Sequence, residues 1–358
     1  MSGFNYQMSL FDGQQELRID KPIRLIELFA GIGAQAKALT NLGVPFEHYR
    51  ICEFDKYAVK SYNAIHGTDF KTSDIMEITA DDLGITETDK YCYIMTYSFP
   101  CTDLSKAGQQ KGMAKGSGTR SGLLWEVERL LREIHDNGNE LPQILLMENV
   151  PDVIGTKNIK HFADWVAFLD NIGYETRWEV LNAKNYGIPQ NRDRCFAISW
   201  LKSMGDCYYA FPAKMELKDC LADVLQRTVF PKYYLSEKAV QSFRASMRKQ
   251  QAKGNGFKFE PTNGGGTAKA VLSRAGERTC DNFIIETGNA VRENDRLCDD
   301  LNGERLQGFR QSSDDGGRGK NAHGVMLETS DKYNAGLLKH LSRSITTEGK
   351  NGVVEWKK

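Results

Sequence analysis

The stretch "IRLIELFAGIGAQA" at residues 23–36 limits the possible fold more than any other part of the sequence. An apolar run with the length of a buried strand ends in glycines and passes directly into a segment of helical composition. Gly31 and Gly33 allow the backbone to turn tightly and to approach a ligand closely. A strand, a glycine turn and a helix in this order are typical of the first unit of an α/β sheet.

The same alternation of apolar runs and helical patterns continues to about residue 202. Strands that alternate with helices predict an α/β fold, in which a doubly wound, mostly parallel sheet carries helices on both faces. Further strands are expected at residues 49–54, 91–99, 143–150 and 195–201, and helices at 34–43, 56–67, 122–138 and 161–174.

The pattern changes beyond residue 203, where glycine and polar clusters interrupt short strand-like pieces and one charged helix is expected at 236–251. We therefore predict a polar N-terminal arm at 1–21, a catalytic and cofactor-binding domain at 22–202 and a smaller, loop-rich domain at 203–358.

Several classes of protein do not fit the composition. The longest apolar runs are too short to span a bilayer, and the N-terminus lacks a basic segment followed by an apolar stretch, so we expect a cytoplasmic protein without membrane contacts. The eight cysteines form no CxxC pair, which predicts reduced thiols and no metal site. The equal counts of 47 basic and 47 acidic residues leave a nucleic-acid partner open.

Acidic residues follow the next strands along the chain. Glu53 comes twenty residues after Gly33, at the end of the second strand, where a carboxylate accepts hydrogen bonds from ribose hydroxyls. Asp74 and Ile75 follow what would be a third strand and suit an adenine, although a Ser-Asp pair before an apolar residue is also an ordinary helix cap. A nicotinamide dinucleotide fits the glycine turn and Glu53 as well as any other nucleoside cofactor does.

Polar or reactive side chains lie at, or just past, the ends of the predicted strands. In a doubly wound sheet, ligands bind beyond the carboxyl ends of the strands, so these side chains should converge on one crevice. They are Gly31, Glu53, Asp74, Cys101 and Glu148.

Cys101 follows Pro100, which restricts the local backbone, and precedes a polar, glycine-containing loop that runs to Gly122 and suits closure over a substrate. By position alone, Cys101 also fits a small buried hydrophobe. Glu148 ends a strongly apolar strand, where burial raises the pKa of a carboxyl group and lets it hold a proton near neutral pH.

Arg192 and Arg194 alternate in an extended segment before the last strand, so both guanidinium groups should face the same side. Beside a glutamate and a thiol, they suit an anionic or carbonyl-bearing substrate. Each taken alone also fits a solvated charged loop.

Five short motifs occur in order within residues 23–200: "FAGIG" (29–33), "SDI" (73–75), "SFPCTDLS" (98–105), "MENV" (147–150) and "QNRDR" (190–194). Together they resemble the motifs of the DNA cytosine-5 methyltransferases. One departure is Thr102, where many members of that family carry glutamine, and we expect it to be tolerated.

The resemblance implies a Rossmann-like fold that binds S-adenosyl-L-methionine, with the ring of Phe54 against the adenine. The implied cofactor-binding residues are Phe29, Ala30, Gly31, Ile32, Gly33, Glu53, Phe54, Asp74, Ile75 and Pro100.

The resemblance also implies the catalytic residues. Cys101 would be the nucleophile that adds to carbon 6 of cytosine, and Glu148 the partner of the ring nitrogen. Arg194 would contact the base carbonyl, and Arg192 would support the closing loop or a phosphate. A stacked base is out of reach, so the target cytosine would have to swing out of the duplex.

Family members normally end with two further motifs, and the segments that look like them, at 287–291 and 304–309, stand in reversed order. We interpret both as chance matches; the tail at 340–358 resembles the stretch that precedes those motifs. The favoured interpretation is a split enzyme, whose second, smaller subunit supplies the missing motifs. A truncated chain and a non-catalytic DNA-binding homologue are the alternatives, and intact Cys101, Glu148 and Arg194 argue against the last.

Double-stranded DNA is the expected partner, because sequence readout requires an additional module such as the glycine-rich second domain. An RNA cytosine methyltransferase would share the catalytic motifs. A nicotinamide-dependent oxidoreductase would explain the glycine turn and Glu53 but not the other motifs. Basic residues of the second domain suit either phosphate contacts or a solvated surface: Lys232, Arg244, Arg248, Lys249, Lys253, Lys258, Lys269, Arg274 and Arg278.

Overall fold

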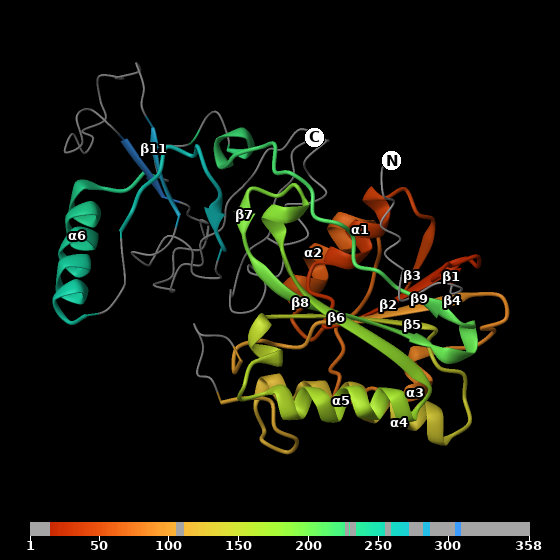
Figure 1. Ribbon diagram of the computed structural model, residues 1–358. Helices are drawn as coiled ribbons and strands as arrows, with labels where there is room; N and C mark the ends of the chain where they lie inside the picture. The colour runs from red at the N-terminus through yellow and green to blue at the C-terminus, as the bar shows by residue number, and fades with distance from the viewer. Residues whose placement is uncertain are drawn as a thin grey trace, which may run out of the picture.

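A six-stranded sheet forms the centre of the computed structural model (Figure 1). The first four strands pair in parallel, and β8 runs antiparallel to both of its neighbours. The predicted α/β fold with a mostly parallel sheet is thereby confirmed. In sheet order the strands are β3 (Phe46–Cys52), β2 (Ile23–Leu28), β4 (Cys92–Tyr97), β5 (Ile144–Asn149), β8 (Asp193–Leu201) and β6 (Tyr174–Asn182).

The structure describes residues 15–104, 111–225, 229, 234–254, 259–271, 282–286 and 305–308. Several positions discussed above lie outside these ranges. They are the segment 287–291, most of the tail, including 340–358, Ser105 of the "SFPCTDLS" motif, and Lys232, Lys258, Arg274 and Arg278.

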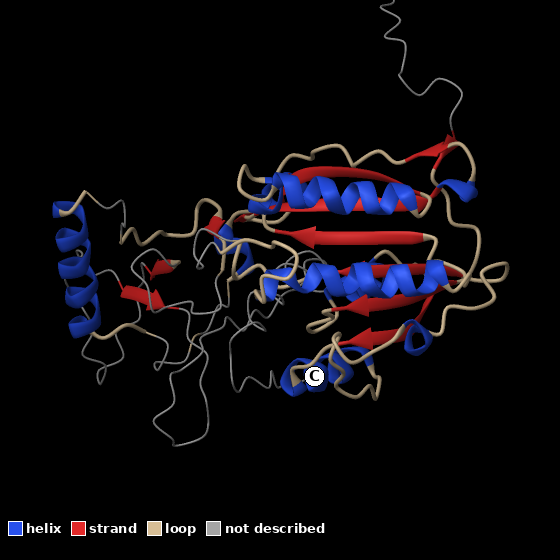
Figure 2. Cartoon of the chain, turned by 90° about the horizontal axis from the view of Figure 1, so that it is seen from below, coloured by secondary structure: helices blue, strands red, loops and turns tan. Residues whose placement is uncertain are grey.

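Helices cover the sheet on both faces, as predicted. Figure 1 shows α1 (Ala34–Asn41) and α2 (Lys56–His66) on one side and α4 (Leu124–Asp136) and α5 (Ile159–Asn171) on the other. Figure 2, seen from below, shows two long helices lying along the near face of the sheet. A single turn, α3 (Ala80–Leu83), packs near α4.

Local sequence explains where α2 begins and ends. The Asp55 carboxylate accepts hydrogen bonds from the backbone N–H groups of Tyr57 and Ala58, which have no partner within the helix. Gly67 ends the helix in the left-handed conformation, with φ of 67°.

The two faces of the sheet differ in burial. Tyr93, Met95 and Tyr97 of β4 belong to the core beneath α4 and α5, and each is 0% exposed. On the opposite face, Leu146 of β5 and Ile198 of β8 are cross-strand neighbours and only half-buried. This difference leaves the second face of β5 and β8 the less covered one.

Two details of the sheet differ from the predictions. The edge strand β6 was not predicted, although the alternation of polar residues with Thr176, Trp178 and Val180 along it is the pattern of a half-buried strand. The strand expected before Asp74 is absent, since residues 68–74 form no strand. The Asn63 side chain instead donates to the Phe70 carbonyl and accepts from the Phe70 N–H, as a strand neighbour would.

A second, smaller group of elements stands apart from the sheet, with α6 at its far side in Figure 1. Its small core contains Leu235, Val240, Phe259 and Phe283. The domain boundary near residue 202 stays a prediction; Ile188, before it, packs with residues after it. The elements are α6 (Glu237–Ala252), β10 (Ala268–Lys269), which pairs with β7 (Gln190–Asn191), and β11 (Phe283–Glu286), which pairs with β12 (Arg305–Gly308).

The described part of the N-terminal arm includes β1 (Gln15–Glu16), which pairs with β9 (Cys207–Tyr208). Within the described ranges, no helix combines the length and the apolar character needed to cross a membrane. Short 3₁₀ turns complete the structure: Arg120–Leu123, Pro151–Ile154, Ala183–Tyr186, Lys202–Met204 and Leu221–Val224.

Candidate active site

The candidate site lies at the edge of the sheet where the parallel strands end. Phe29 directly follows β2, Glu53 directly follows β3, and Glu148 is the penultimate residue of β5. Since β8 is antiparallel, its first residues reach the same edge, and Cys195 pairs with Asn149. The sheet thus brings Arg194 to the strand ends that carry Glu148.

The glycine turn after β2 has an unusual backbone. Phe29, Gly31 and Gly33 have positive φ values of 57°, 57° and 79°. A Cβ atom on Gly33 would lie 2.3 Å from Nε2 of His66, so only glycine fits there. The left-handed Phe29 is strained, which is common where a backbone is shaped for a ligand.

The remaining residues of the turn contribute backbone atoms. Ala30 is buried, and its N–H donates to the Cys52 carbonyl over 3.3 Å. The Ile32 carbonyl accepts a hydrogen bond from Nε2 of His66 over 3.1 Å. These contacts fix the turn against β3 and α2.

Glu53 connects this turn to β3. Its Oε2 accepts the Gly31 N–H and its Oε1 accepts the Asp55 N–H, each over 3.0 Å. Burial raises the pKa of the Glu53 carboxyl above its usual range, while the backbone N–H donors oppose that rise. A carboxylate oxygen accepts more than one hydrogen bond, so Glu53 retains capacity for hydroxyl donors.

The other predicted cofactor residues differ in exposure. The Phe54 side chain is 73% exposed next to Glu53, and Asp74 is also exposed. Ile75 is only 4% exposed and belongs to the main core, so its side chain is directed away from solvent. A cofactor contact by the Ile75 side chain stays a prediction.

One asparagine and one serine side chain fix the loop that carries Cys101. Asn149 donates from Nδ2 to the Phe99 carbonyl over 3.0 Å, and Ser121 donates from Oγ to the Pro100 carbonyl over 2.7 Å. Sequence reasoning missed both contacts, because nothing in a local pattern shows which distant loop a polar side chain reaches.

Charged groups surround the Cys101 thiol. Burial raises the pKa of Cys101, Arg194 and Arg192 lower it through their positive charges, and Glu148 raises it. Arg194 forms an ion pair with Glu148, with 3.0 Å between Nε and Oε1. This guanidinium places a positive charge beside Glu148 that the apolar strand alone does not predict, and the protonated state of Glu148 stays a prediction.

Cys101 differs from the other cysteines that the structure describes, all of which are free thiols. Cys52, Cys92 and Cys195 are buried, and burial raises the pKa of Cys195 to about 12. Cys101 is half-buried and has two arginines near it. The two arginines distinguish Cys101 from a core filler, but burial outweighs their charges and the pKa of the thiol lies above its usual value. Its role as the nucleophile stays a prediction.

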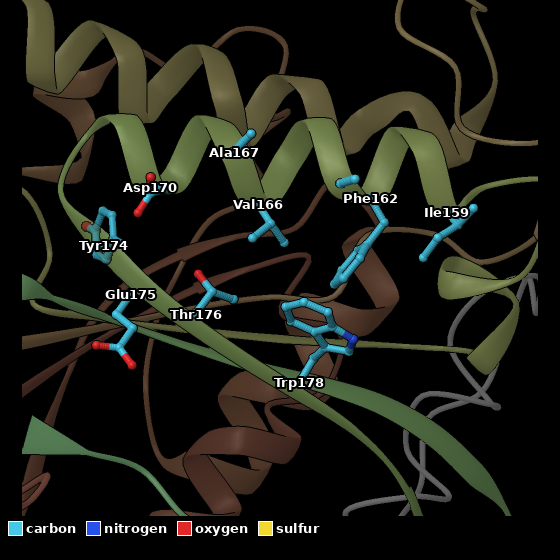
Figure 3. A pocket seen from close by; sticks show the side chains of 10 residues that line it. Ile159, Phe162, Val166, Ala167, Asp170, Tyr174, Glu175, Thr176 and Trp178 are labelled. Atoms are coloured by element: carbon cyan, nitrogen blue, oxygen red, sulfur yellow. The ribbon is translucent and has the colours of Figure 1, made fainter. Parts of the chain in front are cut away.

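A separate groove lies between α5 and β6 (Figure 3), with a volume of about 460 Å³. Phe162 and Trp178 face each other across it, with ring centroids 5.3 Å apart. None of the predicted site residues lines this groove.

Comparison with known proteins identifies relatives with a described activity. The model of the C-5 cytosine-specific DNA methylases matches residues 23–333. The chain is 33% identical over 266 residues to the type II methyltransferase M2.ScrFI of Lactococcus lactis subsp. cremoris, covering 61% of this chain and 71% of that protein. It is 30% identical over 327 residues to the type II methyltransferase M.HpaII of Haemophilus parainfluenzae, covering 86% and 85%.

Solved structures share the fold at low sequence identity. The Entamoeba histolytica methyltransferase EhMeth superposes with a TM-score of 0.60 at 14% identity, covering 91% of this chain and 95% of that one. The S. pombe Dnmt2 methyltransferase gives a TM-score of 0.54 at 18% identity, covering 74% and 76%. The match of the family model over most of the chain decides the assignment: this protein belongs to the C-5 cytosine-specific DNA methylases, enzymes that use S-adenosyl-L-methionine.

Proposed function

We propose that this chain transfers a methyl group from S-adenosyl-L-methionine to carbon 5 of cytosine in duplex DNA, through transient covalent addition of Cys101 to a flipped-out base. The observation that carries the proposal is the ion pair of Arg194 and Glu148 beside the Cys101 thiol, at the edge where the glycine turn also lies.

The cofactor-side residues fit the proposed ligand. Glu53 would accept the ribose hydroxyls, since a carboxylate oxygen that holds a backbone N–H can accept a further hydrogen bond. Phe54 offers an exposed aromatic face for the adenine, and Asp74 offers an exposed carboxylate for its amino group. The bound cofactor supplies an electrophilic methyl group.

Cys101 would supply the nucleophile. Carbon 5 of cytosine is a poor nucleophile until the thiolate forms a bond to carbon 6 and moves electron density toward carbon 5. The charges of Arg192 and Arg194 favour the thiolate that this step needs. After methylation, a base removes the proton from carbon 5, the bond from sulfur to carbon 6 breaks, and the thiolate is regenerated.

Glu148 and Arg194 would bind the base itself. In the structure they neutralise each other, so the site holds both charges ready without a ligand. On base binding, Arg194 would donate to the carbonyl oxygen of the ring. Glu148 would take up a proton from water and pass it to the ring nitrogen. That proton offsets the negative charge that builds up on the ring as sulfur adds.

The test is covalent capture. DNA containing 5-fluorocytosine has no proton on carbon 5 to remove, so the last elimination is blocked and enzyme and DNA stay joined. We expect the Cys101→Ser variant to fold normally, to form no such complex and to transfer no methyl groups. Cys220→Ser is the matched control, because Cys220 is also a half-buried free thiol. Normal turnover by Cys101→Ser would overturn the proposal.

Duplex DNA is the proposed substrate, and basic residues on the second, smaller group of elements support this proposal. Arg248, Lys249 and Lys253 are exposed at the end of α6, where phosphate contacts would make binding sensitive to salt. Since relatives are named type II methyltransferases, we propose the modification role of a restriction-modification system. Methylation of an RNA transcript in preference to plasmid DNA would refute the duplex substrate.

A second protein chain is proposed to complete the enzyme. In the described ranges, α1 and α2 pack on β2 and β3, and the half-buried side chains Leu146, Phe196 and Ile198 continue beyond them toward Glu148. An apolar segment from a partner would cover this face. Full activity of this chain as a monomer, unchanged by co-expression of a neighbouring reading frame, would refute the second chain.

A further inference from the structure

Helix α4 and the 3₁₀ turn that leads into it contact two loops of the proposed site. The apolar side of α4 anchors it in the core, since Val127, Leu130 and Leu131 are each 0% exposed. A helix held in this way has little freedom to shift, so the polar groups that it carries keep fixed positions.

Ser121 is the contact at the N-terminal end. It is 0% exposed, and its Oγ donates to the Pro100 carbonyl over 2.7 Å. The same oxygen accepts the Asp103 N–H over 3.3 Å, and the Ser121 N–H donates back to Oδ2 of Asp103 over 3.3 Å. These three hydrogen bonds bracket Cys101 on both sides.

Arg129 is the contact two turns further along. Its Nη2 donates to the carbonyls of Ile75 and Ile78 over 2.8 and 3.0 Å. Its Nε and Nη1 are held by Glu126 and Glu133 over 2.7 and 2.8 Å. The guanidinium is therefore fixed by the helix and fixes the loop that directly follows Asp74.

From these contacts we infer that Ser121 and Arg129 are positioning residues for different partners in the reaction. Ser121 holds the nucleophile loop, and Arg129 holds the loop on the adenine side of the cofactor site. Ser121 and Arg129 stand eight positions apart, roughly 13 Å along the axis, so the 3₁₀ turn and α4 together set the spacing of the two loops. This inference rests on the proposed function.

The two roles differ in what each residue's loss would change. Without the Ser121 hydroxyl, Cys101 would spend less time in the attacking geometry, and misplacement by about 1 Å costs on the order of 100-fold in rate. Without the Arg129 guanidinium, the loop carbonyls lose charge-assisted hydrogen bonds, which corresponds to an affinity loss of roughly tenfold to 100-fold. If the two residues had a purely structural role, each variant would lower the rate and the cofactor affinity together.

The experiment measures both quantities on the same variants. Calorimetry gives the Kd for S-adenosyl-L-methionine, and a single-turnover assay on unmethylated plasmid DNA gives the rate at saturating cofactor. The rate of Cys101 alkylation by iodoacetamide is a third readout that requires no catalysis. The second chain is included if the assay above shows that it is required.

We expect Ser121→Ala to lower the single-turnover rate and alter the alkylation rate at unchanged Kd. We expect Arg129→Lys to raise the Kd while the rate at saturating cofactor is kept. Lysine retains the charge beside Glu126 and Glu133, which protects folding, but it lacks the planar fork that reaches both carbonyls. Arg132→Gln is the matched control on the same helix, since Arg132 pairs with Glu128 and contacts neither loop in the described residues.

The outcomes separate the hypotheses. If both variants change Kd and rate together, or change neither, the positioning roles are refuted. If the wild-type protein neither binds the cofactor nor methylates DNA, the proposed function fails, and this inference fails with it. If the wild type is active but the two variants do not separate the effect on Kd from the effect on rate, the proposed function stands and this inference is refuted.

Discussion

Arg194 reaches Glu148 because β5 and β8 pair in one register. Glu148 lies opposite Phe196 on the antiparallel neighbour, and Arg194 precedes Phe196 by two residues, so both charged side chains stand on the same face. The resulting contact of 3.0 Å lies where the charges of both residues act on Cys101.

Replacing Glu148 is expected to change thiol reactivity and catalysis in opposite directions. Glu148→Gln removes a negative charge that raises the pKa of Cys101, so that pKa should fall and iodoacetamide should alkylate the thiol faster near neutral pH. Methyl transfer should fall by roughly 100- to 10,000-fold, because the proton donor is lost. Slower alkylation in this variant would contradict the arrangement of charges.

Replacing Arg194 should have the converse effect on the thiol. Arg194→Gln removes a positive charge that lowers the pKa of Cys101, so the pH profile of alkylation should move to higher pH. Lys202→Gln is the control, because Lys202 follows the other end of β8 and pairs with Asp170. Equal shifts in both variants would mean that net charge, and not the local contact, is responsible.

Much of the fold and the candidate site could be predicted from sequence because it depends on local pattern. The strands and helices follow from apolar periodicity, and strand ends converge by the geometry of a parallel sheet. The contacts of Ser121, Asn149 and Arg129 could not be predicted, since each joins segments 21 or more residues apart. The burial of the Ile75 side chain was missed for the same reason: its core neighbours come from other elements.

Gly33 and Gly43 form a matched pair for testing the glycine turn. Both have positive φ, but a Cβ on Gly33 would meet His66 and Tyr62 below 3.0 Å, whereas one on Gly43 would meet nothing within 4 Å. Gly43→Ala should lower the free energy of unfolding by about 1 kcal/mol, the cost of the left-handed conformation. Gly33→Ala should cost roughly 1–3 kcal/mol more through overpacking and should weaken cofactor binding. Equal losses in thermal unfolding would show that the space around Gly33 is not limiting.

Glu128 should make stability depend on acidification. Burial raises the pKa of its carboxyl, but Lys115 and Arg132 outweigh burial, and the pKa lies below its usual range. A lowered folded-state pKa adds stability above the unfolded value of about 4.5, and that stability is lost as pH falls through the folded value. Glu128→Gln should therefore lower the free energy of unfolding at pH 7 by about 1–2 kcal/mol and lessen its loss between pH 5 and 3.

Asp170→Asn is the control, because it breaks an exposed pair with Lys202. In denaturant titrations it should change the free energy of unfolding by less than about 0.5 kcal/mol. If both variants lose the same stability and keep the same pH dependence, the ion pairs of Glu128 with Lys115 and Arg132 do not stabilise the fold.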